Sequence, residues 1–249
     1  MNSAFRSPPH TRPSQQTAAL RPHGSFDLAW LNTQGHPEWE TRVLPVSDVI
    51  DAAVSSLARG TLLSTPDGQI AIEDLNPGMM VNTAIGPPAR VQWIGSRCYA
   101  EDTAPTTETR APLYRVCTGA FGHNAPPHDL VLAHAAAVLL RTPTCRKLIG
   151  QDMGFAPITA FEDSYNVTRI LPAGEMTVYN IALRNHEAVI ANGLPVESFH
   201  PCRNASHLLN QDGLRELARL FPHLSARNGF GPQRVAHLSL SETRSLGLF

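Results

Sequence analysis

Short apolar runs separated by turn residues fill the middle of this 249-residue chain. Each run is four to six residues long and is bounded by turn sequences such as Pro-Asp-Gly, Asn-Pro-Gly and Pro-Ala-Gly. The runs lie at residues 61–64, 69–73, 80–84, 90–93, 113–118 and 167–171. Strands this short and this closely spaced predict an all-β core.

The clearest hairpin signal comes late in the chain, where residues 187–191 and 194–197 flank the pair Asn192-Gly193. An Asn-Gly pair suits a two-residue type I′ turn, which needs a positive φ at both positions. We therefore expect two antiparallel strands joined at this pair.

Apolar residues at helical spacing lie on both sides of this β region. Over residues 47–57 they follow the i, i+3, i+4, i+7 pattern, and Ser47 is suited to cap the helix. A second such pattern over residues 212–221 ends at Pro222, which cannot continue a helix. The sequence thus predicts a short helix before the β region and a helical segment after it.

These patterns divide the chain into a tail (1–25), a lead-in segment (26–54), a β domain (55–202) and a helical appendix (203–249). The tail has four prolines, three arginines and no acidic residue, and its lack of apolar surface favours a flexible segment. An arginine-rich leader is also typical of organelle transit peptides, but prolines disfavour their amphipathic helix. The appendix either packs on the β domain or binds a partner.

Charge and hydropathy exclude some classes of partner. Lys and Arg total 20 against 21 for Asp and Glu, so the formal net charge of -1 gives no general attraction to nucleic acid or to an anionic membrane. No apolar window is long enough for a membrane span, and the tail lacks the apolar core of a signal peptide. A cytoplasmic location is the default expectation.

The cysteines form neither a CxxC pair nor an evenly spaced framework, so we expect reduced, mostly buried thiols at Cys98, Cys117, Cys145 and Cys202. A metal cluster of His123, His128 and His134, completed by Cys145 or His200, lacks the tight ligand spacing of zinc sites. The sequence therefore predicts no metal and no cofactor.

Three stretches share a family pattern when they are read in order. The first, at 56–78, reads SLARGTLLSTPDGQIAIEDLNPG, and the second, at 129–140, reads DLVLAHAAAVLL. The third, at 178–183 and 186–198, reads VYNIAL and HEAVIANGLPVES. Together they resemble the Hint (hedgehog/intein) superfamily, and most closely a bacterial branch of stand-alone Hint-domain proteins. The first stretch resembles the family's opening block with its nucleophile, and the third resembles its closing block.

The resemblance spans roughly residues 55 to 200. It implies a flat, pseudo-twofold β fold that brings both ends of the domain together around one reactive peptide bond. In the family, the first residue of the domain attacks the carbonyl before it, and that position is Ser56 here. The chain's own N-terminal segment would then be the substrate. A serine hydroxyl needs a base, an oxyanion donor and a proton for the leaving amine.

The chain departs from the family pattern where this help is expected. Aligned on the family's Thr/Ser-x-x-His motif, the Thr/Ser and His positions are Ala133 and Ala136, whose side chains form no hydrogen bonds. His134 lies two residues before the expected histidine, about 6.6 Å away along an extended strand. It is either a displaced substitute base or a structural residue.

The closing block also differs from that of splicing proteins. His186 fits the family's histidine and is either a helper near Ser56 or a strand-end residue without chemistry. Asn180 stands where inteins often carry an acid, and an amide cannot shuttle protons. Glu197 and Ser198 stand where splicing proteins carry histidine and asparagine, and their side chains cannot form the succinimide that ends splicing. Two-ended splicing is therefore disfavoured.

Two hypotheses from different classes follow. In the leading one, self-processing is weakened or lost and the domain acts as a structural or binding module. In the alternative, the protein is an enzyme that acts on itself by an N-to-O acyl shift at Ser56, without splicing. A helix through residues 55 and 56 argues against cleavage, because a helical peptide bond is unstrained and turned away from its own side chain.

Overall fold

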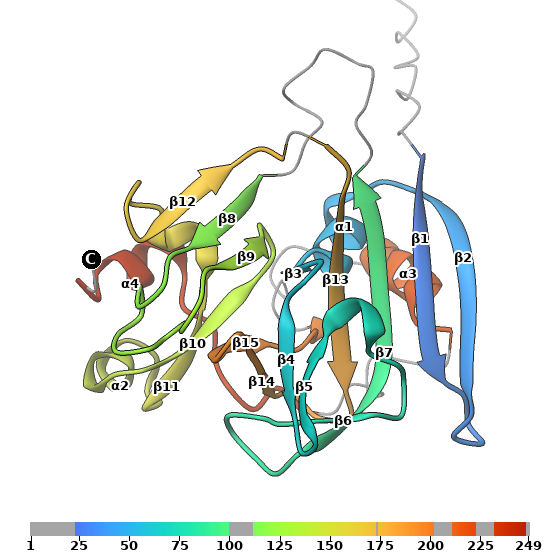
Figure 1. Cartoon of the computed structure of the whole chain (residues 1–249), viewed down its shortest axis with the longest axis horizontal. Coiled ribbons are helices and arrows are strands. Elements are labelled where there is room, and N and C mark those ends of the chain that lie inside the picture. The colour runs from blue at the N-terminus through green and yellow to red at the C-terminus, as the bar shows by residue number, and fades with distance from the viewer. Residues whose placement is uncertain (1–22, 100–111, 173, 202–210, 223–231, 248–249) are drawn as a thin grey trace, which may run out of the picture.

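The computed structural model of the protein describes residues 23–99, 112–172, 174–201, 211–222 and 232–247. It is mainly β, with two antiparallel sheets and few helices, as the sequence pattern predicts (Figure 1). None of the helices in these ranges is long and apolar enough to cross a membrane. The expectations for residues 1–22, 202–210, 223–231 and 248–249 lie outside the described residues.

The larger sheet has nine strands, and the predicted runs at 90–93, 113–118 and 167–171 belong to it. The order from edge to edge is β12 (Val167–Ile170), β8 (Leu113–Val116), β9 (Leu130–Ala133), β3 (Leu57–Ala58), β13 (Met176–Leu183), β7 (Ala89–Tyr99), β1 (His23–Leu31) and β2 (Pro37–Pro45). A ninth strand, β6 (Met80–Val81), pairs with β7 outside this row.

The smaller sheet has six strands and joins β4 (Leu62–Thr65) and β5 (Gly68–Ala71) of the opening block to β14 (Ala188–Ala191) and β15 (Leu194–Glu197) of the closing block. Its order is β11 (Met153–Pro157), β10 (Ala137–Arg141), β15, β14, β4 and β5. Side chains from both sheets form one buried cluster, which includes Leu63, Val138, Ile181 and Val196. Each such side chain contributes about 1.5–3 kcal/mol by leaving water, so burial of this cluster fixes how the sheets pack.

The predicted late hairpin is confirmed. Asn192 and Gly193 have φ values of 43° and 78° between β14 and β15, as a type I′ turn requires. Asn192 also joins this hairpin to the opening strands, because its Oδ1 accepts the N–H of Leu62 at 2.7 Å and its own N–H donates to the Leu62 carbonyl at 2.8 Å. The turn therefore fixes the closing block beside the opening block.

The lead-in segment contains more structure than the sequence analysis predicts. Strand β1 begins at His23, inside the range assigned to the tail, and forms a hairpin with β2. Residues 27–30 of β1 pair with residues 93–96 of β7, so the hairpin extends the larger sheet. Phe26, Leu28 and Trp30 are buried, and their alternation is the strand signal that the prediction missed.

The predicted helix before the β region is shorter than expected. Helix α1 (Asp48–Val54) begins after Ser47, whose side chain accepts the N–H of Ile50 as an N-cap. It ends at Val54, and Leu57 already belongs to β3. The expected helix over 47–57 is therefore wrong at its C-terminal end, and the peptide bond between residues 55 and 56 lies outside it.

Three further helical segments lie between the strands: η1 (Ile72–Asp74), α2 (Pro143–Ile149) and η2 (Ile158–Phe161). Helix α2 was not predicted, although its ends carry clear signals. Thr142 caps it by accepting the N–H of Cys145, Pro143 occupies its first turn, and Gly150 ends it at φ 70°.

The cysteines lie on separate elements. Cys98, Cys117 and Cys145 are free thiols, but only Cys145, within α2, is buried, so the expected burial of most thiols is wrong for these three. Cys202 lies outside the described residues.

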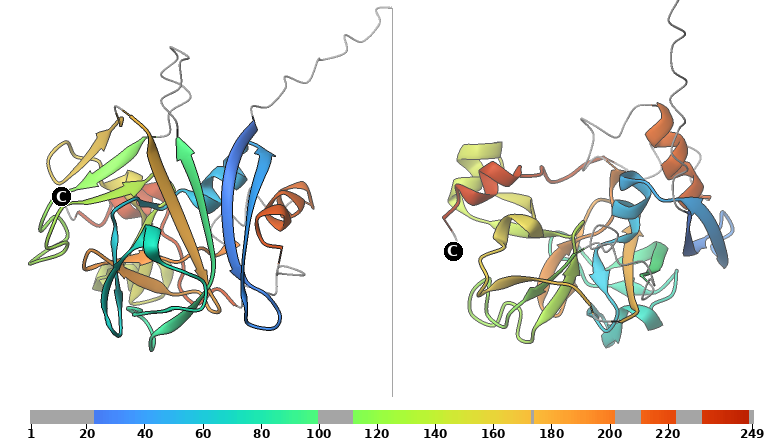
Figure 2. Two further views of the ribbon diagram at one scale, coloured as in Figure 1. Left: turned by 45° about the vertical axis from the view of Figure 1, so that its right-hand side comes forward. Right: turned by 90° about the horizontal axis from the view of Figure 1, so that it is seen from above.

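The appendix is helical only in part. Helix α3 (Gln211–Leu220) packs near α1 on one side of the molecule, and α4 (Leu240–Arg244) lies on the opposite side (Figures 1 and 2). Residues 232–239 are not helical, and His237 forms a parallel bridge with Phe155 of β11. The predicted packing of the appendix on the β domain is thus seen for the described parts.

Candidate functional site

Ser56, the predicted nucleophile, lies in a bend directly before β3, between two strands of the larger sheet. Its N–H donates to the carbonyl of Tyr179 at 3.0 Å, and its own carbonyl accepts the N–H of Ala133 at 2.8 Å. The side chain is buried, with 2% of the residue exposed. The peptide bond before Ser56 therefore lies in the hydrogen-bonded turn between α1 and β3 and not in a helix.

The carbonyl that Ser56 would attack belongs to Ser55. This carbonyl accepts the N–H of Ala135 at 3.1 Å. An N–H in that position would also stabilise the oxyanion of an attacked carbonyl. The backbone thus keeps one element of acyl-transfer chemistry, independently of the side chains around it.

Ser56 lines a small cavity of about 30 Å³ between α1 and the closing block. Its polar lining comes from Ser56, Asn180, Glu197, Ser198 and His200. A polar cavity of this volume has room for one or two water molecules. The structure therefore brings the first residue of the predicted domain and its last residues to one place.

His134 lies with a different group of side chains. Its Nε2 is 3.4 Å from Oδ2 of Asp51, and Asp51 also binds Arg97 and the hydroxyl of Tyr99. That hydroxyl is 2.9 Å from Oγ of Ser55. Burial, helped by the charge of Asp51, raises the pKa of Tyr99, so its hydroxyl stays protonated. His134 is thus linked to the Ser55 side chain through Asp51 and Tyr99, and it does not line the Ser56 cavity.

The two alanines of the second block are buried, with 0% of Ala133 and 1% of Ala136 exposed. Both belong to the apolar interior, and their methyl groups supply neither a proton nor an acceptor. The backbone N–H of Ala133 still donates to the Ser56 carbonyl.

His186 is fully buried at the start of the closing block. Its Nε2 lies 2.8 Å from Oε1 of Glu197, and its ring packs against His200 with the centroids 4.6 Å apart. Because Glu197 and His200 both line the Ser56 cavity, His186 is connected to that cavity through them. His186 itself does not line it.

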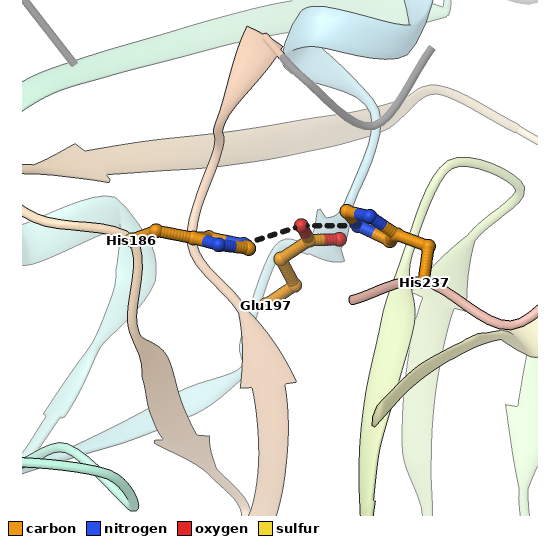
Figure 3. A group of neighbouring side chains, drawn as sticks. All are labelled: His186, Glu197 and His237. Carbon is orange, nitrogen blue, oxygen red and sulfur yellow. Dashed lines mark hydrogen bonds and ion pairs between the residues drawn. The ribbon is translucent and has the colours of Figure 1, made fainter. Parts of the chain in front are cut away.

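His237, which no sequence pattern indicated, is also part of this cluster. Its Nε2 lies 2.6 Å from the same Oε1 of Glu197, on the other side of the carboxylate from His186 (Figure 3). It comes from the appendix, where the bridge to Phe155 positions it. No local motif marks it, because its neighbours in space are far away in sequence.

Two further contacts fix the closing block. The Ser198 hydroxyl donates to the carbonyl of Glu187 at 3.0 Å, and the Glu187 side chain forms an ion pair with Arg234. Burial raises the pKa of Glu187, although the charge of Arg234 opposes this effect. Ser198 is therefore engaged as a structural hydrogen-bonding group.

Comparison with known proteins identifies the family. A model of the Hint domain matches residues 55–203, which is more than half of the chain. The chain belongs to the Hint domain family. The matched range begins one residue before Ser56 and leaves the β1–β2 hairpin, α1, α3 and α4 outside the Hint domain.

The Hint domain of this chain is related to intein-like self-processing domains. Solved structures that match it include a bacterial intein-like domain from Clostridium thermocellum, which is 14% identical and has a TM-score of 0.37. That match covers 58% of this chain and 99% of the other. No curated protein matches the chain.

Proposed function

We propose that this Hint domain has lost self-cleavage and acts as a structural module that joins the segments on either side of it. The main support is the lack of suitable catalytic side chains at the family's positions around Ser56. Alanines occupy the positions of the family's Thr/Ser and His, and His134 pairs with Asp51. No hydrogen bond joins the Ser56 hydroxyl to a side chain in the part of the chain that the structure describes.

The rate acceleration that the missing catalytic groups would supply supports this proposal. A positioned general base is worth about 10²–10⁴ in rate. The carboxylate of the cavity lining, Glu197, is engaged through its Oε1 with His186 and His237. The peptide bond before Ser56 is also hydrogen-bonded at both ends, because its N–H donates to Tyr179 and its carbonyl accepts from Ala135.

A joining role fits the packing of the flanking segments. Phe26 of β1, Ile50 of α1 and Leu220 of α3 lie in one buried cluster with Trp93 of the Hint domain. The indole N–H of Trp93 donates to the carbonyl of Leu220 at 2.7 Å. The Hint domain thus provides the surface on which segments from both ends of the chain meet.

A second candidate function is autoprocessing at Ser56, and the Ala135 N–H on the Ser55 carbonyl favours it. In this reaction Oγ of Ser56 attacks that carbonyl carbon, the C–N bond breaks, and the freed nitrogen takes a proton. The resulting ester between residues 55 and 56 is then hydrolysed by water, which leaves a fragment that begins at Ser56. The segment before Ser56 is the substrate.

Intact mass under denaturing conditions separates the two functions. The freshly expressed chain, the chain treated with hydroxylamine and a Ser56→Ala variant are compared. Loss of self-cleavage predicts the full-length mass in all three samples. A fragment that starts at residue 56, forms faster with hydroxylamine and is missing from Ser56→Ala would overturn this proposal and establish the second function. Ser55→Ala is the matched control, because it alters the neighbouring hydroxyl and leaves the nucleophile in place.

A further inference from the structure

Three side chains that can bind a metal meet at Glu197. His186 precedes β14, Glu197 ends β15 and His237 comes from the appendix, so three separate parts of the fold supply them. One ligand atom from each lies within 4.8 Å of the other two. Figure 3 shows the two imidazoles on either side of the carboxylate. His186 and Glu197 are buried, and the His237 side chain is only 17% exposed.

We propose that His186, Glu197 and His237 form a binding site for a divalent transition-metal ion, with Zn²⁺ as the best fit. Two imidazoles and one carboxylate are a common protein ligand set for zinc, and a fourth position is then left for water or another ligand. The proposal does not depend on whether Ser56 cleaves, because none of the three residues is assigned a step in either function above.

The distances show what binding requires. Zinc lies about 2.0–2.2 Å from nitrogen and oxygen ligands, so tetrahedral ligand atoms are about 3.3 Å apart. The two nitrogens are 2.8 and 2.6 Å from Oε1 of Glu197, which are hydrogen-bond distances. The carboxylate must withdraw by about 0.5–0.7 Å from the nitrogens, which rotation of the Glu197 side chain can supply. The ligand atoms now lie within 4.8 Å of one another, so the two imidazoles must also move until their nitrogens are about 3.3 Å apart. The one negative charge then offsets half the charge of the ion.

The groups behind the histidines determine how costly binding is. Nδ1 of His186 accepts the backbone N–H of Arg234 at 3.3 Å, and Nδ1 of His237 lies 3.2 Å from the Gln233 side-chain nitrogen. Both imidazoles therefore carry their proton on Nε2. When zinc occupies Nε2, that proton moves to Nδ1. Gln233 must then present its oxygen, and the long bond from Arg234 is lost.

The hydrogen-bond partner of each Nδ1 should therefore affect zinc affinity. Metal-binding histidines usually have a carboxylate or carbonyl behind them, and such partners change affinity by about 10–100-fold. Here Gln233 stands in that place for His237. A Gln233→Glu substitution supplies a carboxylate acceptor and should tighten zinc binding by about tenfold. A cluster that is only a hydrogen-bonded contact gives no reason for such a gain.

Zinc binding also affects the appendix. His237 lies outside the range matched by the Hint model, whereas His186 and Glu197 lie inside it. An ion held by all three would fasten residues 232–239 to the smaller sheet, next to the backbone bonds between Phe155 and residues 236 and 238. The metal would therefore act as a structural link between the Hint domain and the C-terminal segment.

The test uses the full chain, stripped of metal and titrated with Zn²⁺ against a competing chelator. We expect one equivalent of zinc to bind and the melting temperature to rise by several degrees. Glu197→Gln and His237→Gln keep groups that can hydrogen-bond at these places but remove a strong ligand. Each should lower zinc affinity at least tenfold and abolish the rise in melting temperature, while the metal-free protein stays folded.

His134→Gln is the matched control, because it removes a histidine that also faces a carboxylate but lies outside the cluster. It should bind zinc like the parent chain. Failure of the parent to bind one equivalent, or equal binding by Glu197→Gln and His237→Gln, would overturn the metal site and leave a hydrogen-bonded contact. An unchanged affinity in Gln233→Glu would overturn the part assigned to Gln233.

Discussion

Gly95 lies on β7, covered by the side chain of Trp93 from the same strand and by Val54 of α1. A Cβ at this position would be 2.2 Å from Cη2 and 2.3 Å from Cζ2 of the Trp93 ring, and 3.0 Å from Cγ1 of Val54. Trp93 is fully buried and bonded to Leu220, so it has little room to move. We predict that Gly95→Ala lowers the free energy of unfolding by about 1–3 kcal/mol, as measured by urea denaturation.

Gly174→Ala is the control for this prediction. A Cβ at Gly174 meets nothing within 4 Å, so the free energy of unfolding should change by no more than about 0.5 kcal/mol. If the two variants lost the same stability, the close approach of Gly95 to Trp93 would not be the cause.

Asp163 carries a pH-dependent part of the stability. Burial raises its pKa, but this is outweighed by the N–H groups of Val167 and Tyr165 and by the side chain and backbone of Asn166, which leave the pKa below its usual value. A carboxyl whose pKa is lowered by folding stabilises the protein above the unfolded-state pKa and loses that effect as pH falls through the folded-state pKa.

We therefore predict that Asp163→Asn lowers the free energy of unfolding by about 1 kcal/mol at pH 7. The difference from the parent should shrink as the pH falls below about 4, where the parent carboxyl becomes protonated. Denaturation curves at a series of pH values measure both effects. Asp67→Asn, in an exposed turn, should show neither. A difference for Asp163→Asn that is constant down to pH 2 would contradict the prediction.

At the scale of residues, the sequence could indicate the candidates but not their partners. Ser56, His186 and Glu197 stand in motifs whose order along the chain is readable. That His134 pairs with Asp51, and that His237 meets Glu197, depends on contacts between distant segments. Such contacts follow from how the strands pair, which local patterns do not specify.

Among the elements, α3 shows that the appendix belongs to the core. Phe221, directly after this helix, is 2% exposed. The centroid of its ring lies 4.2 Å from the ring centroid of Trp93 and 5.0 Å from that of Phe199. Removing a buried aromatic side chain costs about 3–5 kcal/mol. We predict a loss of this size for Phe221→Ala in chemical denaturation.

Leu240→Ala is the comparison for Phe221→Ala. Leu240 begins α4 and is 47% exposed, so its truncation should change the free energy of unfolding by less than about 1 kcal/mol. Should Phe221→Ala prove as mild as Leu240→Ala, the contact between α3 and the Hint domain would contribute little to stability.

Elements were predictable where one local rule dominates. Asn192-Gly193 demands a positive φ at two positions, and the hairpin follows. The alternation of apolar residues in β1 was equally readable. Its partner β2 shows no such pattern, since its apolar residues Trp39 and Val43 are 62% and 67% exposed and do not mark a buried face. The end of α1 was not readable, because apolar spacing continues to Leu57 while pairing with Tyr179 draws that residue into the sheet.

For the whole molecule, the boundary of the Hint domain is not a boundary of the core. Residues 27–30 pair with β7, and Phe26, Leu28 and Val54 share a buried cluster with Trp93. The segment before Ser56 is thus part of the same folding unit as the segment after it. Any cut between residues 55 and 56, whether by the chain itself or by design, would leave these contacts in place.

We therefore predict that the chain expressed as two pieces, 1–55 and 56–249, assembles into one complex. A tag on the shorter piece should retain the longer one through size-exclusion chromatography, and denaturant should separate them. Phe26→Ala should weaken assembly, because this side chain is fully buried in the shared cluster, whereas Trp39→Ala, on the exposed edge strand, should leave it unchanged. A piece 56–249 that folds alone as a stable monomer would show that the Hint domain does not need its lead-in segment.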